Sequence, residues 1–224
     1  MGRQPQRALL LVMMAALVLM AIPFALTACA AKTSGSDSTG AVNSYADQTY
    51  GYSFQYPREW RVQKGDTASV TVGATAKGVV GVFNLKGSSS GGNYIDGVQV
   101  RVYELPVTVD KSMMPDVKTE VQKIFDQLGS QSGDWKALDS LADVTVGGLD
   151  GWTINYSFTS DGEPSLSRFY VVFGGNREYQ LLVQASTKNW EADQPAFDAI
   201  VASFKPGAAT TTTAASPATS STSQ

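Results

Sequence analysis

Short runs of alternating apolar and polar residues constrain the fold of this chain more than any other feature. Successive side chains of a β-strand point to opposite faces, so a period of two predicts strands with one buried face. The turn pair Asp161-Gly162, between two of these runs, is typical of a hairpin. The pattern therefore predicts an antiparallel sheet. Its expected strands span residues 52–56, 60–63, 69–74, 79–85, 97–105, 151–158, 166–173 and 178–186.

The run 97–105 shows the alternation most clearly. Valines occupy positions 98, 100 and 102, whereas positions 99, 101 and 103 hold Gln, Arg and Tyr. This spacing predicts a strand with one apolar, buried face and one polar face. The preceding segment 86–93, KGSSSGGN, is expected to be a loop.

Two segments have the spacing of amphipathic helices. The first carries an apolar stripe, with Pro115 and Asp116 suited to its first turn and Gly129 to its end. The second is expected from Pro195 to Phe204, because proline is tolerated at the start of a helix. Sheet and helices together predict an α+β fold, an antiparallel β-sheet flanked by helices in an α/β/α sandwich. The stripe of the first helix consists of Val117, Val121, Ile124, Phe125 and Leu128.

The amino-terminal segment has the pattern of a secretory signal. Arg3 and Arg7 precede residues 8–26, which carry no charge. The sequence Leu-Thr-Ala-Cys at residues 26–29 resembles the bacterial lipobox, which implies that Cys29 receives a diacylglyceryl group and becomes the mature amino terminus. Two or more acyl chains hold a protein stably at a bilayer. An uncleaved membrane helix is the alternative, but Pro23 and the small residues before Cys29 favour processing.

The composition divides the chain into four parts. A signal peptide at residues 1–28 is followed by a small, polar tether at 29–44, a folded domain at 45–206 and a Ser/Thr/Ala/Pro tail at 207–224. Of the 22 aromatic residues, only Phe24 lies outside residues 45–204, so the hydrophobic core must form there. The expected location is the outer face of the cell membrane, with the protein attached by its lipid.

Composition also limits the chemistry that is open to this chain. It has no histidine and a single cysteine, which excludes histidine-dependent triads, disulfides within the chain and cysteine-based metal clusters. A formal net charge of −3 without a basic run lacks the electrostatic pattern of a nucleic-acid binder. We therefore expect no cofactor, no resident metal and no nucleic-acid partner.

Several polar clusters are candidate sites, but solvated turns explain the carboxylates better, a connection between strands explains the glycine loop, and the Ser-Lys pair is too common a pattern to indicate a site. Asp139, Asp143 and Asp150 could serve as paired acids, and Asp161 with Glu163 at the hairpin tip could do the same. Other candidates are a calcium site at 160–163, a Ser-Lys pair in the segment 186–188 and a phosphate loop at the glycines 87, 91 and 92, which no Gly-Lys-Ser/Thr follows.

A family resemblance emerges from the order of these landmarks. The segment GYSFQYPREW at 51–60 resembles the opening hairpin of PsbP-like domains, in which Trp60 would fold back onto an aromatic strand face. The segments VGGLDGWTINYSF and REYQLLVQAS and a closing helix that ends in IVASFK resemble later parts of that family. The resemblance covers residues 49–206 and implies a sheet between helices.

The resemblance implies non-catalytic docking rather than catalysis. We expect a lipid-anchored protein that binds a partner protein or envelope component and is not an enzyme. Two alternatives remain: a carrier of a small apolar ligand, and a hydrolase that uses serine or carboxylates. Cys29 is the only residue to which the sequence assigns a specific role, as the site of lipid attachment.

Overall fold

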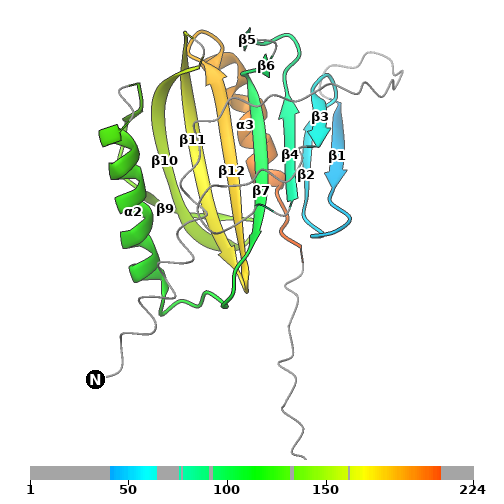
Figure 1. The fold of residues 1–224 in the computed structure, drawn as a ribbon. Coiled ribbons are helices and arrows are strands. Elements are labelled where there is room, and N and C mark those ends of the chain that lie inside the picture. Colours follow the sequence, from blue (N-terminus) through cyan, green and yellow to red (C-terminus); the bar gives the residue numbers. More distant parts are fainter. Residues whose placement is uncertain are drawn as a thin grey trace, which may run out of the picture.

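The computed structural model describes residues 41–64, 76, 78–90, 93–131, 134–160 and 162–207 (Figure 1). Within this part of the chain, a large antiparallel sheet has the strand order β3-β4-β7-β12-β11-β10-β8, and β9 also pairs with β10. Its strands are β3 (Arg61–Lys64), β4 (Gly78–Phe83), β7 (Gly97–Glu104), β8 (Lys136–Ala137), β9 (Ala142–Val146), β10 (Leu149–Ser160), β11 (Glu163–Gly174) and β12 (Arg177–Ser186).

Two smaller ribbons accompany the large sheet. Strand β1 (Val42–Ala46) pairs with β2 (Ser53–Pro57), and β5 (Ser89–Ser90) pairs with β6 (Asn93–Tyr94). Residues 42–44, which the sequence assigns to the tether, are thus part of β1, because they pair with residues 55–57 of β2. The predicted loop 86–93 contains the short β5 and the first residue of β6.

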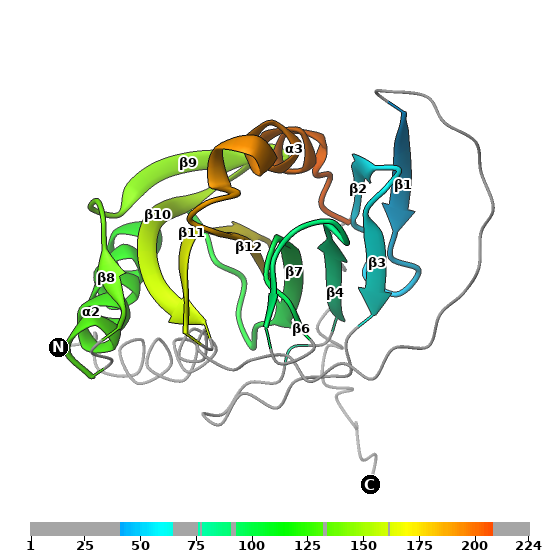
Figure 2. The ribbon, with the colours of Figure 1, turned by 90° about the horizontal axis from the view of Figure 1, so that it is seen from above.

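Two described helices lie on opposite sides of the large sheet, which confirms the α+β class. Helix α3 (Trp190–Ser203) crosses one face, and α2 (Met114–Gln131) lies on the other side, beside the β10 end (Figure 2). Among the helices that the structure describes, none combines the length and apolar character that crossing a bilayer requires.

The core beneath α3 is aromatic on the side of the β1–β2 ribbon. Tyr52 and Phe54 are buried, and the ring of Trp60 meets that of Phe197 from α3 edge to face at 5.7 Å between centroids. The prediction that Trp60 folds back onto the core is confirmed. This contact joins the first hairpin to the last helix, two segments far apart in the sequence.

The core beneath α2 is separate from the first. Val117, Val121, Ile124 and Phe125 are buried in it, as their spacing predicts, and they share it with aromatic and aliphatic residues of β10 and β11. The expected end at Gly129 is wrong, because α2 continues to Gln131. Gly129 lies against the ring of Trp135, so its lack of a side chain serves packing there.

The start of α3 also differs from its prediction. The helix begins at Trp190 and contains Pro195 in its interior, where proline removes one hydrogen bond of the helix. Tertiary contacts outweigh that loss, because Trp190 packs on Phe197 and Asn189, just before the helix, bonds to the buried Asp96. The predicted strand at 69–74 lies outside the described residues.

Candidate functional site

Polar side chains lie along two neighbouring central strands, on the face of the sheet opposite α3. We call this set the β7–β12 polar strip, and it consists of Gln99, Arg101 and Tyr103 from β7 and Glu178, Gln180 and Gln184 from β12. Cross-strand pairing places Glu178 opposite Tyr103 and Gln180 opposite Arg101. The same two strands present valine, leucine, alanine and tyrosine to α3, so the difference in polarity separates the two faces of the sheet.

The strip is buried at its centre and at the end formed by Tyr103 and Glu178, and it is partly open only at the other end. Glu178 and Gln180 are each 2 % exposed, whereas Gln99 and Gln184 are half-buried. The Gln180 amide donates a hydrogen bond to Glu178 Oε1 at 2.6 Å, and the Arg101 guanidinium donates to Gln99 Oε1 at 3.1 Å. Each of these contacts joins two residues of one strand, and the strip presents both hydrogen-bond donors and acceptors.

Burial changes the electrostatics of this strip. It raises the pKa of Glu178 to about 7, although the hydrogen bond from Gln180 acts in the opposite direction. It also raises the pKa of the Tyr103 hydroxyl, which the nearby Arg101 partly offsets. A carboxyl group that is half protonated near neutral pH can both donate and accept hydrogen bonds. Such perturbed groups are concentrated at binding and catalytic sites in general.

The strip adjoins the apolar core under α2 rather than interrupting it. Leu182 of β12 belongs to that core together with Phe169, Val171 and Phe173 of β11. In one row of paired residues across four strands, Trp152 of β10 and Val171 of β11 are apolar. The next two residues, Gln180 of β12 and Arg101 of β7, are polar. The polar strip therefore begins where the buried apolar core under α2 ends.

The predicted acids of the segment 139–150 serve separate local contacts. Asp139 accepts hydrogen bonds from the backbone and side-chain amides of Asn155, and Asp143 Oδ1 lies 2.6 Å from Lys118 Nζ. The bond and charge of Lys118 lower the pKa of Asp143. Asp143 and Asp150 line one surface depression of about 470 Å³ with Lys111, but Asp139 does not.

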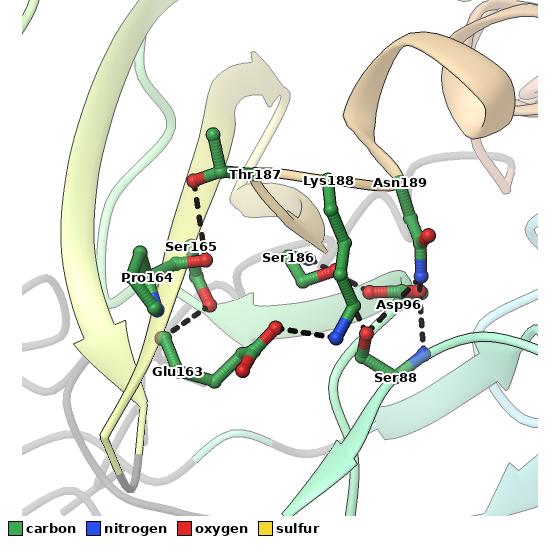
Figure 3. A network of polar contacts seen from close by, with 9 residues as sticks. All are labelled: Ser88, Asp96, Glu163, Pro164, Ser165, Ser186, Thr187, Lys188 and Asn189. Carbon is green, nitrogen blue, oxygen red and sulfur yellow. Dashed lines mark hydrogen bonds and ion pairs between the residues drawn. The ribbon is translucent and has the colours of Figure 1, made fainter.

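The predicted Ser-Lys pair lies in a structural network (Figure 3). Ser186 is fully buried and its hydroxyl lies 2.8 Å from that of Ser88, while Lys188 Nζ is 2.7 Å from Glu163 Oε1. The structure therefore gives Ser186 neither a lysine base nor access to substrate. Of the predicted calcium segment 160–163, Asp161 lies outside the described residues and Glu163 is engaged by Lys188.

The centre of this network is the fully buried Asp96. Its carboxylate accepts hydrogen bonds from the backbone amides of Ser88 and Ser186, at 2.7 and 2.8 Å, and from the Asn189 side chain at 2.6 Å. Gly87, from the proposed phosphate loop, packs so closely on Asp96 that a Cβ would collide with the carboxylate. Glycines 91 and 92 of that loop lie outside the described residues.

Cys29, the predicted site of lipid attachment, lies outside the described residues. Across the described parts of the chain, no group of three or more acidic or cysteine side chains is placed to hold a metal ion. The sequence does not reveal the β7–β12 polar strip, because the alternation at 97–105 predicts only one buried face, whereas Arg101 and Tyr103 on the polar face are buried as well. The polar residues at 178, 180 and 184 within the run EYQLLVQAS were the available signal.

The chain belongs to the PsbP family, whose model matches residues 40–206. The solution structure of cyanobacterial PsbP (CyanoP) from Synechocystis sp. PCC 6803 is similar, with 19 % identity and a TM-score of 0.49, over 78 % of this chain and 98 % of that one. LpqN of Mycobacterium tuberculosis, with 13 % identity and a TM-score of 0.51, is similar over 75 % of this chain and 92 % of its own. No curated protein matches the sequence.

Proposed function

We propose that this protein is a lipoprotein, anchored through Cys29 on the outer side of the cell membrane, whose PsbP domain binds a protein partner of the envelope without catalysis. The observation that carries the binding role is the β7–β12 polar strip. A sheet face that served packing alone would bury apolar residues, as the α3 face does, because burying a carboxyl group costs free energy. Here Glu178 is buried in the strip with Gln180.

The choice of a protein partner follows from the groups in the strip. Guanidinium, carboxyl and amide groups supply donors and acceptors together, and the apolar residues under α2 lie beside them. Interfaces between proteins contain many hydrogen bonds, which such a mixture of donors and acceptors can supply. An envelope location has further support from LpqN, which has a similar fold and is described as involved in cell envelope biogenesis.

The structure offers less support for the two alternatives. A carrier of an apolar ligand needs an enclosed apolar cavity. Of two depressions among the described residues, one mixes Met114, Val144 and Trp152 with lysine and aspartate side chains, and the other is lined mainly by polar side chains. A serine hydrolase needs an accessible nucleophile, which the buried Ser186 does not provide. Neither observation favours these functions over partner binding.

Radioactive palmitate tests the anchor. Cells that express the chain should incorporate label into the protein, and the Cys29→Ser variant should incorporate none and should keep its uncleaved amino-terminal segment. A Ser157→Ala variant provides a control for substitution in the folded part. Equal labelling of the Cys29→Ser chain would contradict lipid attachment at that residue.

Crosslinking tests the binding surface. A photoreactive amino acid at the half-buried position 99 or 184 should capture one specific protein in cells, and the same group at the exposed Thr49 should not. Adding Arg101→Gln should reduce capture about tenfold, because truncating a central charged residue of an interface is costly. Capture that is unchanged by Arg101→Gln, or equal at Thr49, would reject the strip as the interface. Capture of glycan or lipid alone would reject a protein partner.

A further inference from the structure

Exposed apolar side chains gather at the end of the domain where the described chain begins. Of the four large apolar residues that are exposed in the described parts, Val42, Leu85 and Tyr94 lie at this end, with exposed fractions of 52 %, 36 % and 36 %. Val42 opens β1, and the other two lie in the connection from β4 to β7 (Figure 1). The fourth, Leu138, pairs beside β10 at the opposite edge of the sheet.

The connection that carries Leu85 and Tyr94 is held by the Asp96 network. Asp96 bonds to the Ser88 amide and to Asn189, which precedes α3, and Asn84 donates to Asp193 of α3 at 2.9 Å (Figure 3 shows the Asp96 contacts). The ring of Tyr94 stacks on Phe83 at 6.2 Å. The two apolar side chains are therefore presented by a fixed framework, although burying them would be more favourable.

Basic residues surround these apolar side chains. Arg58 and Arg61 flank the turn between β2 and β3, and Lys86 follows Leu85; all three are exposed, with Glu59 as the acidic neighbour. The backbone places them close together, since Val42 pairs with Pro57 and Arg61 pairs with Phe83. We call this surface the tether end: Val42, Arg58, Arg61, Leu85, Lys86 and Tyr94. The opposite end of the sheet carries Asp47, Glu104, Asp110 and Asp150.

The length of chain before the domain brings this surface close to the membrane. Cys29 precedes Ala41 by only about 12 residues, which can span at most about 40 Å when extended and about 20 Å on average when flexible. Ala41 lies at the tether end, because its carbonyl accepts a hydrogen bond from the Arg58 amide at 3.1 Å. A lipid on Cys29 would thus hold this end of the domain nearest to the bilayer.

We propose that the tether end rests on an anionic lipid surface, with Leu85 and Tyr94 at the depth of the headgroups. This inference rests on the proposed lipid anchor. Tyrosine suits the membrane interface because its ring is apolar and its hydroxyl is polar, and arginine and lysine are attracted to anionic lipids. The strands then run away from the membrane, so the β7–β12 polar strip faces sideways, with its half-buried residues Gln99 and Gln184 toward the tether end.

The single cysteine makes a direct test practical. In the lipidated chain purified from membranes, the sulfur of Cys29 is blocked, so a cysteine introduced by Leu85→Cys is the one free thiol for an environment-sensitive fluorophore. The matched control carries Thr49→Cys, an exposed position at the far end. Both chains are reconstituted into phosphatidylcholine vesicles with about one-quarter phosphatidylglycerol. Fluorescence and its quenching by spin-labelled lipids are then compared.

We expect the emission of the fluorophore at position 85 to shift to the blue. Spin-labelled lipids should quench it about threefold more than the fluorophore at position 49. Arg58→Gln together with Lys86→Gln should reduce that difference by half or more, as should neutral vesicles. Equal quenching at both positions would overturn the proposal, as would protection of position 85 that requires an envelope protein instead of lipid. The intact mass of the purified chain reports lipidation separately, so a missing lipid rejects the anchor and not the contact surface.

Discussion

At the scale of single residues, Glu178 gives the domain an unusual dependence of stability on pH. Burial raises its pKa in the folded protein from 4.5 to about 7. Below pH 4.5 the side chain is protonated in both states, and its contribution to stability is complete. As pH rises toward 7, the unfolded chain releases this proton and the folded protein keeps it, so the free energy of unfolding falls by on the order of 3 kcal/mol. Asp193 adds to this trend, because burial chiefly raises its pKa.

Urea unfolding between pH 4.5 and 8 measures this effect. Glu178→Gln should remove most of the slope and should make the protein more stable than the parent at pH 8, since a neutral amide avoids the cost of a buried charge. Glu104→Gln, an exposed neighbour on β7, should leave the slope unchanged. A slope of the same size in Glu178→Gln would show that other groups are responsible.

Asp96 holds together the connection from β4 to β7 at the tether end of the sheet. Replacing it with Asn keeps its shape but places a donor among the three donors that now bond to the carboxylate. We expect a loss of about 3 kcal/mol or more in the free energy of unfolding, because buried donors lose their acceptor. Asp198→Asn, an exposed residue with a long 3.4 Å contact to Arg168, should change it by less than about 0.5 kcal/mol. Equal effects would refute the structural role of Asp96.

At the scale of elements, close approach of the β11 backbone explains the glycine at position 151, the third residue of β10. A Cβ at Gly151 would collide with the carbonyl oxygen of Val171 on β11, which backbone pairing holds in place. Gly151→Ala should therefore cost about 3 kcal/mol or more. Gly174→Ala, which meets only the flexible end of Leu149 at 3.0 Å, should cost clearly less. Thermal unfolding ranks the two, and the reverse order would contradict this account.

The contact between Trp60 and Phe197 couples the first hairpin to the last helix. Each single alanine variant should lose about 3–5 kcal/mol of unfolding free energy, since both rings are buried in the α3 core. In a double-mutant cycle, the edge-to-face pair should show a coupling of about 1 kcal/mol. Strict additivity would mean that the two rings stabilise the core independently.

Elements could be predicted from the sequence where one local pattern decided them. The alternation at 97–105 and the stripe from Val117 to Phe125 each define one buried face, and both elements exist as expected. The start of α3 could not be predicted, because Asn189 is held by Asp96, which is 93 residues away. The β7–β12 polar strip could not be predicted for the same reason: it depends on residues far apart in the sequence. Glu178 and Tyr103 become neighbours only when β12 pairs with β7.

At the scale of the whole molecule, the two faces of the sheet differ in polarity. The α3 face joins both chain ends of the domain into one apolar core, with Tyr45 from β1 and Phe204 after α3. The other face is shared between the α2 core and the β7–β12 polar strip. Both faces thus carry an apolar core, and the polar groups proposed for recognition lie only on the face of the α2 core.

This division predicts where the folded unit ends. Phe204 packs on Tyr52 and Tyr179, with centroid distances of 6.1 and 5.6 Å, and Lys205 exchanges two backbone hydrogen bonds with Ser53 at 2.8 and 2.9 Å. A chain that stops after Ser203 should lose about 3–5 kcal/mol of unfolding free energy, because a buried aromatic ring and a backbone bridge disappear together.

A chain that stops after Gly207 is the matched control. It keeps every one of these contacts and removes only the uncharged tail from residue 208 onward, whose composition cannot build a core. Its free energy of unfolding in urea should lie within about 0.5 kcal/mol of that of the complete chain. A large loss on removing the tail alone would mean that residues beyond 207 complete the fold. Equal stability of both truncated chains would mean that Phe204 does not close the α3 core.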